Sequence, residues 1–281
     1  MAKLIKIYSE NNVFQLADTL KRNRKKRASE GLFFVEGVQA LNFAAQYGWQ
    51  IDSLLFSSER GLSGWARGML KNTPASQHVD MPAALLEKLS DKEEETSELL
   101  ALVAMRPNDL SRIPVGPDLL ALVFDRPSSH GNLGAILRSC ESLKTNGLVI
   151  TGHAVDLYDP KVIRASMGTF FAVPALRLES QKELEQWFAA LAARLPGFQL
   201  LGSSAKGERL IDQADLKRPT VLLLGNETWG LSAAYKELCH GLVRIPMYGT
   251  ITSLNVSCAA SIMLYEADRQ RRAANTTGPI A

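Results

Sequence analysis

Residues 221–232 read VLLLGNETWGLS and carry the clearest structural signal in the chain. The unbroken apolar run 221–224 predicts a strand buried on both faces, which is typical of a parallel sheet covered by helices. In such sheets ligands bind beyond the carboxyl ends of the strands. We therefore expect a binding or catalytic site in the loop that follows, which offers the carboxylate of Glu227. A plain strand-to-helix turn, capped by Ser232, is the alternative.

Strands and helices alternate on both sides of this stretch. The further elements that the apolar periodicity predicts are strands at 119–124, 148–150, 198–201 and 242–245, and helices at 133–144, 160–167, 181–194 and 254–269. This alternation predicts an α/β fold with a mostly parallel sheet. We place that domain at residues 119–272, followed by a flexible tail at 273–281.

The first part of the chain, residues 1–106, predicts a smaller α/β domain. Its expected elements are strands at 32–35, 51–56 and 99–104, and helices at 10–28, 37–47, 63–71 and 82–90. Residues 107–118 contain three prolines and little apolar periodicity, which indicates a linker between the two domains.

The composition narrows the class of protein. Hydrophobic residues make up 46% of the 281 residues and charged residues 22%, an ordinary globular balance, and the net charge of +3 permits an anionic partner without requiring one. No apolar run reaches the ~20 residues of a membrane span, and we expect a cytoplasmic protein without membrane contact. The cysteines form no Cys-x-x-Cys pair and the histidines lack ligand spacing, so neither a disulfide framework nor a metal site is expected.

Two further loops place polar residues where a helix begins. Asn132 follows the strand at 119–124 at the start of a helix that also carries Arg138, and N–H groups at such a helix start suit an anion. Ser253 and Asn255 open the apolar helix near the C-terminus; Ser253 is a residue type suited to an N-cap, whereas Asn255 is expected inside the helix, where its propensity is poor. Polar residues placed against local preference indicate function. Simple helix capping is the alternative for both loops.

Together the three loops are more specific than any one of them. Residues 131–138 (GNLGAILR), 224–232 (LGNETWGLS) and 245–257 (IPMYGTITSLNVS) resemble, in residues, spacing and order, the SpoU (TrmH) family of RNA ribose 2′-O-methyltransferases. The intervening stretch 161–174 is also similar to this family. The N-terminal block, with its basic run 21–27, resembles the L30e-like RNA-binding domain that often precedes the catalytic domain.

The resemblance implies a catalytic domain with a deep trefoil knot, which general folding rules would not predict. It implies S-adenosylmethionine as cofactor and a homodimer in which each active site is completed across the interface. The residues expected to hold the cofactor, largely through main-chain groups and apolar packing, are Leu224, Gly225, Asn226, Gly230, Ile245, Met247 and Leu254.

The same resemblance assigns catalytic residues, which are Asn132, Arg138, Glu227, Ser253 and Asn255. A guanidinium has a pKa above ~12 and is an awkward general base. We therefore expect Arg138 to grip a phosphate and orient the ribose hydroxyl. Asn132 is expected to bind the ribose or orient Arg138, and Glu227 to fix an arginine or the substrate. Ser253 and Asn255 are expected to shape the methyl-transfer site.

Two positions depart from the family pattern. His130 stands where related sequences often have proline, and it either contacts the substrate or is a solvent-facing loop residue. Trp229 occupies a position that is usually small or polar, and it either stacks on a base or covers the pocket.

The expected function is methylation of a ribose 2′-hydroxyl, with ribosomal RNA favoured over tRNA because the fused N-terminal domain suggests a folded RNA target. Residues expected to contact RNA are Lys21, Arg22, Arg24, Lys25, Lys26, Arg27 and Arg164, although basic runs are commonly solvated helix ends. The alternatives are a tRNA ribose methyltransferase, a base methyltransferase of the same knotted class, and an inactive RNA-binding or ribosome-assembly protein. A dehydrogenase-like domain is disfavoured by the missing Gly-x-Gly-x-x-Gly fingerprint. A housekeeping role and an antibiotic-resistance role remain equally open.

Overall fold

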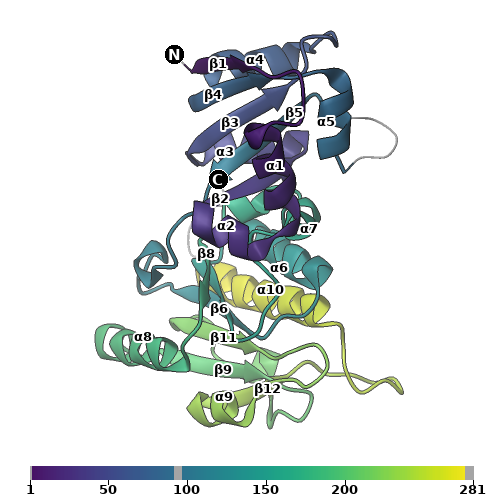
Figure 1. Ribbon diagram of the computed structural model, residues 1–281. Helices are drawn as coiled ribbons and strands as arrows, with labels where there is room; N and C mark the ends of the chain where they lie inside the picture. Colours follow the sequence, from purple (N-terminus) through teal and green to yellow (C-terminus); the bar gives the residue numbers. More distant parts are fainter. Residues whose placement is uncertain (1, 92–96, 276–281) are drawn as a thin grey trace. The chain divides into compact units, whose positions relative to one another are not determined.

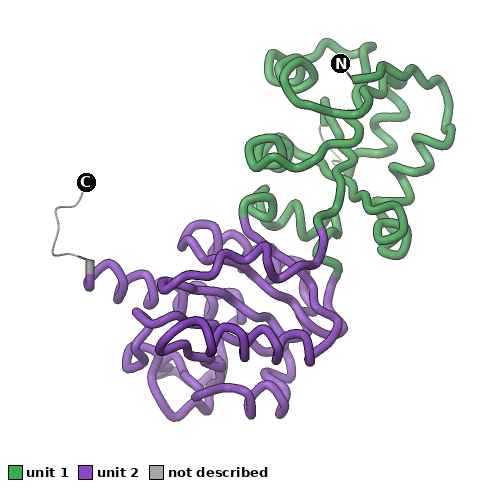
Figure 2. Tube along the Cα trace, turned by 90° about the vertical axis from the view of Figure 1, so that its left-hand side faces the viewer, with its two compact units in different colours: residues 1–106, 156–172 green, residues 107–155, 173–281 purple. Residues whose placement is uncertain are grey.

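The computed structural model describes residues 2–91 and 97–275. The chain forms two compact units (Figures 1 and 2), of which unit 1 comprises Met1–Arg106 and Asp156–Ala172, and unit 2 comprises Pro107–Val155 and Val173–Ala281. The last helix continues to Asn275, three residues into the expected tail at 273–281, and the remainder of that tail lies outside the described residues.

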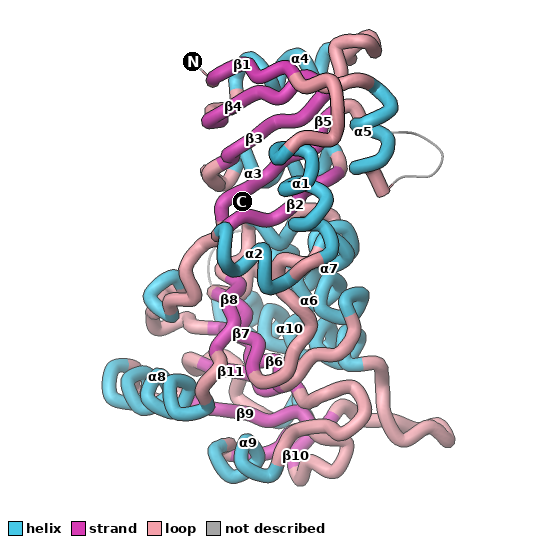
Figure 3. Tube along the Cα trace, in the orientation of Figure 1, coloured by secondary structure: helices cyan, strands magenta, loops and turns pink. Residues whose placement is uncertain are grey.

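Unit 2 is built on a seven-stranded sheet (Figure 3). All the paired strands in this sheet run parallel. Its strands are β6 (Leu120–Asp125), β7 (Gly147–Thr151), β8 (Ala175–Leu178), β9 (Gln199–Ser203), β10 (Arg209–Leu210), β11 (Thr220–Leu224) and β12 (Gly241–Arg244). The spatial order is β10-β12-β9-β11-β6-β7-β8. The predicted parallel α/β sheet is confirmed. The apolar strand β11 pairs with β6 near the middle of this sheet.

Helices cover both faces of this sheet. They are α6 (His130–Ser142), α8 (Gln181–Arg194), α9 (Ala233–Leu238) and α10 (Val256–Asn275), with short 3-10 turns at Leu110–Arg112 and Ile211–Gln213. Helices α8 and α9 pack on one face, where Val123 and Val221 share a core with Trp187 and Tyr235. Because successive strand residues alternate between faces, Phe124 points to the opposite face. Helices α6 and α10 lie side by side (Figure 1).

Unit 1 contains a five-stranded mixed sheet in the order β1-β4-β3-β5-β2. Its strands are β1 (Lys3–Lys6), β2 (Leu32–Glu36), β3 (Ile51–Phe56), β4 (Ala75–Asp80) and β5 (Leu99–Ala104). Its helices are α1 (Asn12–Arg22), α2 (Arg24–Glu30), α3 (Val38–Gln46), α4 (Gly64–Asn72), α5 (Ala83–Leu89) and α7 (Pro160–Ala165), followed by a 3-10 turn at Thr169–Phe171. Apolar periodicity predicts neither β1 nor β4, which pair parallel with each other.

The basic segment is not the single helix that we expected at 10–28. The chain leaves the helix at Asn23 with φ −118° and ψ 103°, and the Asn23 side chain then accepts a hydrogen bond from Lys26 N at 3.1 Å. Asparagine competes with the helical backbone in this way and favours caps. The segment is therefore two helices, α1 and α2, joined at a capping residue.

The boundaries of the units differ from the expected domains. The segment 156–172, expected inside the catalytic domain, belongs to unit 1, where Phe171 O accepts a hydrogen bond from Trp49 Nε1 at 2.9 Å. The expected linker 107–118 belongs to unit 2, and its Ile113 is buried in that unit's core. Prolines indicate that a segment lacks regular secondary structure, but such a segment can still pack tightly against a domain, as 107–118 does here. The chain consequently passes between the two units three times.

Two observations concern possible surroundings of the chain. None of the helices within 2–91 and 97–275 is long and apolar enough to cross a membrane. Across the same residues, the side chains of His, Cys, Asp and Glu form no group of three suited to a metal ion. The knot that the family resemblance implies stays a prediction.

Candidate active site

Three loops of unit 2 follow the carboxyl ends of parallel strands, namely those after β6, β11 and β12. Glu227, in the loop after β11, connects the first two. Its carboxylate accepts hydrogen bonds from Ser128 N at 3.0 Å, Ser128 Oγ at 2.8 Å and Ser129 N at 3.0 Å, all in the loop after β6. The carboxylate that the sequence singled out therefore holds two strand-end loops together.

Asn132 connects Glu227 to the third loop. Its Nδ2 donates to Glu227 Oε1 at 3.3 Å, and its Oδ1 accepts from Asn255 Nδ2 at 3.0 Å. Glu227, Asn132 and Asn255 thus form one hydrogen-bonded series, to which we refer as the motif relay. The structure brings together three of the five residues expected to be catalytic, each from a different loop.

The helix caps differ from those expected. Ser129 is the N-cap of α6, since its Oγ accepts Asn132 N at 3.3 Å, which leaves the Asn132 side chain for the motif relay. At α10 the first helical residue is Val256, so Asn255 lies just before the helix, and its Oδ1 accepts Ser257 N at 2.8 Å. The expected position of Asn255 inside the helix was wrong, and the alternative in which Ser253 caps the helix is also wrong, because the free Ser257 N–H is bonded to the Asn255 side chain instead.

The electrostatics of Glu227 favour its charged form. Burial acts to raise the pKa of its carboxyl group, but the hydrogen bonds from its own N–H and from Ser128 and Ser129 outweigh burial and lower the pKa. A carboxylate that only accepts hydrogen bonds from N–H and O–H groups is stabilised as the anion. Glu227 is therefore a fixed negative acceptor at neutral pH.

Arg138 and Ser253 lie outside the motif relay. Arg138 is exposed on α6, and its guanidinium forms no hydrogen bond or ion pair with any residue that the structure describes. With 3.6 residues per turn, it points about 120° around the helix from Asn132 and lies about 9 Å further along. Ser253 is also exposed. The structure does not bring these two residues into contact with Asn132, Glu227 or Asn255.

The loop after β11 is closed on itself. Asn226 N donates to Gly230 O at 3.1 Å and Gly230 N donates to Asn226 O at 2.9 Å. A Cβ atom on Gly225 would collide with the backbone of Gly230 and Leu231, so only glycine fits at that position. Leu224 and Gly225 are buried and Asn226 and Gly230 half-buried, which gives the loop a tight, fixed base.

The loop after β12 has the opposite character. In the part of the chain that the structure describes, no main-chain N–H or C=O group of residues 245–254 is hydrogen-bonded to protein. Ile245, Met247 and Leu254, the apolar residues expected to hold the cofactor here, are half-buried. Free main-chain donors and acceptors beside apolar side chains suit a ligand with a heterocyclic base and an aliphatic part.

Asp125 and Arg126, to which the sequence motifs assign no role, lie at the centre of these loops. Asp125 is the last residue of β6 and is buried, and its Oδ2 accepts Arg126 Nη2 at 2.8 Å. Arg126 Nη2 also approaches Gly230 O at 3.4 Å. The available signal was a charged pair directly after a fully apolar strand, where a buried charge needs a partner.

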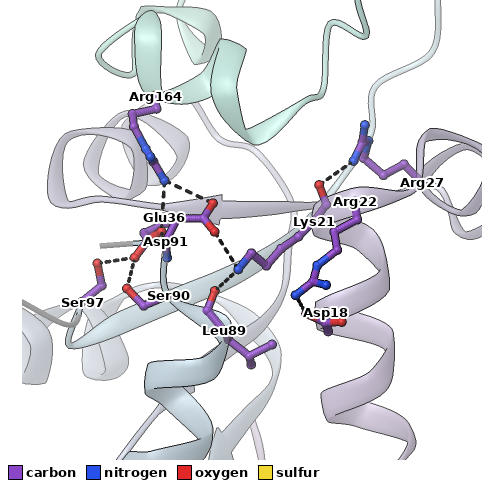
Figure 4. A network of polar contacts seen from close by, with 10 residues as sticks. All are labelled: Asp18, Lys21, Arg22, Arg27, Glu36, Leu89, Ser90, Asp91, Ser97 and Arg164. Carbon is purple, nitrogen blue, oxygen red and sulfur yellow. Dashed lines mark hydrogen bonds and ion pairs between the residues drawn. The ribbon is translucent and has the colours of Figure 1, made fainter. Parts of the chain in front are cut away.

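Two of the residues expected to contact RNA are internal to unit 1 (Figure 4). Only 7% of the Lys21 side chain is exposed, and its ammonium pairs with Asp91 at 2.8 Å. The Arg27 side chain is 2% exposed and its Nε donates to Asp156 Oδ2 at 2.7 Å. Both charges are paired with carboxylates inside the unit. Lys21 and Arg27 are therefore not available at the surface for the phosphate contacts that the sequence predicts.

The other cations of this set are closer to the surface. Arg22 pairs with Asp18 and Lys26 with Glu30, each across one helical turn, while Arg24 is half-buried. Lys25 is exposed and has no hydrogen bond or ion pair among the residues described. Arg164, on α7, is half-exposed and reaches Asp91 at 3.2 Å (Figure 4).

Comparison with known proteins agrees with this geometry. A model of the SpoU rRNA methylase family matches residues 119–265, and a model of the SpoU L30e-like domain matches residues 11–101. A 23S rRNA (uridine(2479)-2′-O)-methyltransferase of Streptomyces viridochromogenes is 43% identical over 271 residues, which cover 96% of this chain and 94% of that protein.

Solved structures give the same result. The SpoU methyltransferase AviRb from Streptomyces viridochromogenes, crystallised with AdoMet (S-adenosylmethionine), has a TM-score of 0.89 at 43% identity and covers 93% of this chain and 98% of its own. An AdoMet-bound rRNA methyltransferase from Sinorhizobium meliloti has a TM-score of 0.81 at 25% identity and covers 95% of this chain and 98% of its own. This chain belongs to the SpoU rRNA methylase family, as its match to both family models shows, and its fold and motif relay agree with that assignment.

Proposed function

We propose that this chain transfers the methyl group of S-adenosylmethionine to a ribose 2′-hydroxyl of ribosomal RNA. The observation that carries the proposal is the motif relay, because Glu227, Asn132 and Asn255 unite three loops at the carboxyl edge of a parallel sheet. The relative from Streptomyces viridochromogenes, whose name specifies a uridine 2′-O position of 23S rRNA, supports 23S rRNA as the target. From this substrate we infer a cytoplasmic location.

The residues present fit the cofactor. S-adenosylmethionine supplies a methyl group on a positively charged sulfur, which needs no metal ion for transfer. The free main-chain groups of residues 245–254 offer hydrogen bonds to an adenine and an amino acid, and Ile245, Met247 and Leu254 offer apolar contact. The closed loop 225–230, with Leu224 before it, forms the other wall.

The chain's own residues then have to align the hydroxyl and hold the RNA. The guanidinium of Arg138 is a cationic group that only donates hydrogen bonds, and it is exposed without a protein partner among the described residues. We infer that Arg138 binds the phosphate next to the target ribose through paired N–H donors. The motif relay fixes the Asn132 amide beside the site, and Ser253 lies in the loop that shapes its rim.

The direction of Arg138 also supports a homodimer, because the residue points away from Asn132 of its own chain. Helix α10 exposes an apolar stripe of Cys258, Ile262 and Tyr265, spaced so that all three lie on one face. We propose that this stripe meets its copy and that Arg138 completes the partner's site. Ile262→Glu should convert the dimer to monomer in light scattering, whereas Val38→Glu, a similarly exposed apolar position in unit 1, should leave it intact. A monomeric wild type contradicts the dimer.

We further propose that the surface around Lys25, with Arg22 and Lys26 beside it, binds RNA phosphates. Surface ion pairs such as Arg22–Asp18 are weak and exchange readily for a phosphate. Lys25→Glu should weaken binding to an rRNA fragment and reduce its salt dependence. Lys71→Glu on α4, an equally exposed lysine of the same unit, is the matched control. Equal effects of both variants would remove Lys25 from the RNA surface.

The activity test uses labelled S-adenosylmethionine with separate pools of unmodified 23S rRNA, 16S rRNA and tRNA. Wild type should place label in an alkali-resistant dinucleotide of 23S rRNA, because a 2′-O-methyl group blocks cleavage. Arg138→Ala should lose this label, and Arg194→Ala, an exposed arginine in the last turn of α8, should keep it. Label in tRNA alone would favour the tRNA alternative. Tight RNA binding without transfer would favour the inactive RNA-binding protein.

A further inference from the structure

The pair Asp125–Arg126 ties several segments of the site to the end of one buried strand. Asp125 Oδ1 accepts Arg126 Nε at 3.0 Å, and Oδ2 accepts Arg126 Nη2 at 2.8 Å, so the two side chains form a two-pronged pair. Asp125 Oδ2 also accepts Ser232 N at 3.3 Å. The hydrogen bond with Asp125, above all, raises the pKa of Arg126 and keeps the guanidinium charged.

The backbone of Arg126 has an unusual conformation. Its φ of 50° lies in the left-handed region, which costs energy for any residue with a Cβ and persists only where its surroundings enforce it. Arg126 N donates to Thr151 O at 3.1 Å. A Cβ on Gly152 would lie 2.6 Å from Arg126 Cγ, so the neighbouring loop has a glycine where the arginine side chain passes. The fold thus accommodates this arginine specifically.

Arg126 grips the closed loop after β11 at both ends. Its carbonyl oxygen accepts Asn226 Nδ2 at 2.7 Å, and its Nη2 approaches Gly230 O at 3.4 Å. Asn226 and Gly230 are the two residues whose mutual hydrogen bonds close the loop. Asn226 Oδ1 in turn accepts Thr228 N at 2.9 Å, so its orientation determines the shape of the loop tip.

We propose that Arg126 is a positioning residue that sets the loop 226–230 in the form that binds S-adenosylmethionine. The left-handed backbone aims the Arg126 carbonyl at Asn226, and the guanidinium, braced by Asp125, fixes Gly230. Arg126 contacts neither RNA nor the reacting atoms in this scheme, so its effect falls on cofactor affinity. The inference rests on the proposed function, since it takes this loop to be a wall of the cofactor site.

Arg126→Lys is the variant to test. Alanine would leave the buried carboxylate of Asp125 unpaired, which destabilises a fold by itself. Lysine retains a positive charge beside Asp125 but lacks the planar fork that spans Asp125 and Gly230. The matched control is Arg271→Lys on α10, because Arg271 donates to Leu216 O at 3.0 Å and Leu119 O at 3.0 Å, away from the three loops.

S-adenosylmethionine binding without RNA is measured by titration calorimetry, together with Tm and with KM for each substrate and kcat. We expect Arg126→Lys to raise the Kd and the KM for S-adenosylmethionine about ten-fold, equal to about 1.4 kcal/mol, while kcat and the KM for RNA change less than two-fold. Arg271→Lys should lower Tm without changing that Kd.

An unchanged Kd in Arg126→Lys overturns the proposal. A loss of kcat and a weaker affinity for both substrates together, as expected of general unfolding, also overturns it. Wild type that fails to bind S-adenosylmethionine would contradict the proposed function itself. Wild type that binds normally, with an Arg126→Lys variant of equal affinity, contradicts only the role of Arg126.

Discussion

Replacing Asn132 by alanine removes the central amide of the motif relay. Two hydrogen bonds are lost, one to Glu227 at 3.3 Å and one to Asn255 at 3.0 Å. At about 0.5–1.5 kcal/mol net for each bond, the free energy of unfolding should fall by about 1–3 kcal/mol. The effect on catalysis should lie at the upper end of this range, because a displacement of about 1 Å at an active site costs about 100-fold in rate. We expect methyl transfer to slow by about 100-fold, equal to about 2.7 kcal/mol.

A double-mutant cycle tests whether the relay acts as a unit. Asn132→Ala, Asn255→Ala and the double variant are compared in single-turnover methyl transfer with saturating cofactor. Both single variants break the same Asn132–Asn255 bond, so the double variant should lose little more rate than either alone. Losses that multiply, to about 10,000-fold, would show that the two residues act independently and refute the reasoning.

The control cycle uses Ser139 and Ser261, whose hydroxyl oxygens lie 2.7 Å apart between α6 and α10, the same pair of helices. Alanine at these two positions should show coupling in the free energy of unfolding but none in the rate.

Three further outcomes follow from the site and its surroundings. The pKa of Glu227 is lower in the folded protein than its ordinary value of 4.5, so its carboxylate stabilises the fold above pH 4.5. This stabilisation is lost as the pH falls through the pKa of Glu227 in the folded protein. The free energy of unfolding, measured with urea on either side of pH 4.5, should therefore depend less on pH in Glu227→Gln than in the wild type. Burial raises the pKa of Cys140 to about 12 and that of Cys239 to about 11, so iodoacetamide should modify neither of these thiols in the folded protein and both after unfolding, as read by mass spectrometry. Gly225→Ala should weaken S-adenosylmethionine binding in calorimetry by about ten-fold or more, because its Cβ forces the closed loop apart, and an unchanged affinity would contradict the close packing at that position.

The site residues could be predicted where their position after a strand is enough to place them at the carboxyl edge of the sheet. Asn132 and Glu227 follow the buried apolar strands β6 and β11, Asn255 lies beyond β12, and parallel strands bring their carboxyl ends to one edge. Helix capping was less predictable, because Ser129 and Asn255 compete with neighbouring polar residues for the same N–H groups. Arg126 was missed because apolar periodicity carries no information about a left-handed backbone.

Apolar runs in the sequence predict most of the fold. The prediction fails where contacts between distant segments, rather than local apolar content, determine the structure. Strand β4, with the sequence ASQHVD, has little apolar content, and it forms because β1 and β3 satisfy its backbone from both sides. Lys21 and Arg27 look like surface cations in the sequence, yet their partners come from distant segments. Such long-range ion pairs leave no pattern in the local sequence. The basic run 21–27 therefore predicted more exposed positive charge for RNA than the structure has.

The position of segment 156–172 within unit 1 has a consequence for how the chain is made. Arg27 emerges from the ribosome long before its partner Asp156. The rings of Phe33 and Trp49 likewise emerge long before Phe171, whose ring packs against both of them. At a synthesis rate of about 5–20 residues per second, the N-terminal unit waits several seconds for its last layer. During that interval the nascent chain exposes an apolar face and an unpaired cation, and the first domain can be completed only after residues 107–155 of the second domain have been synthesised.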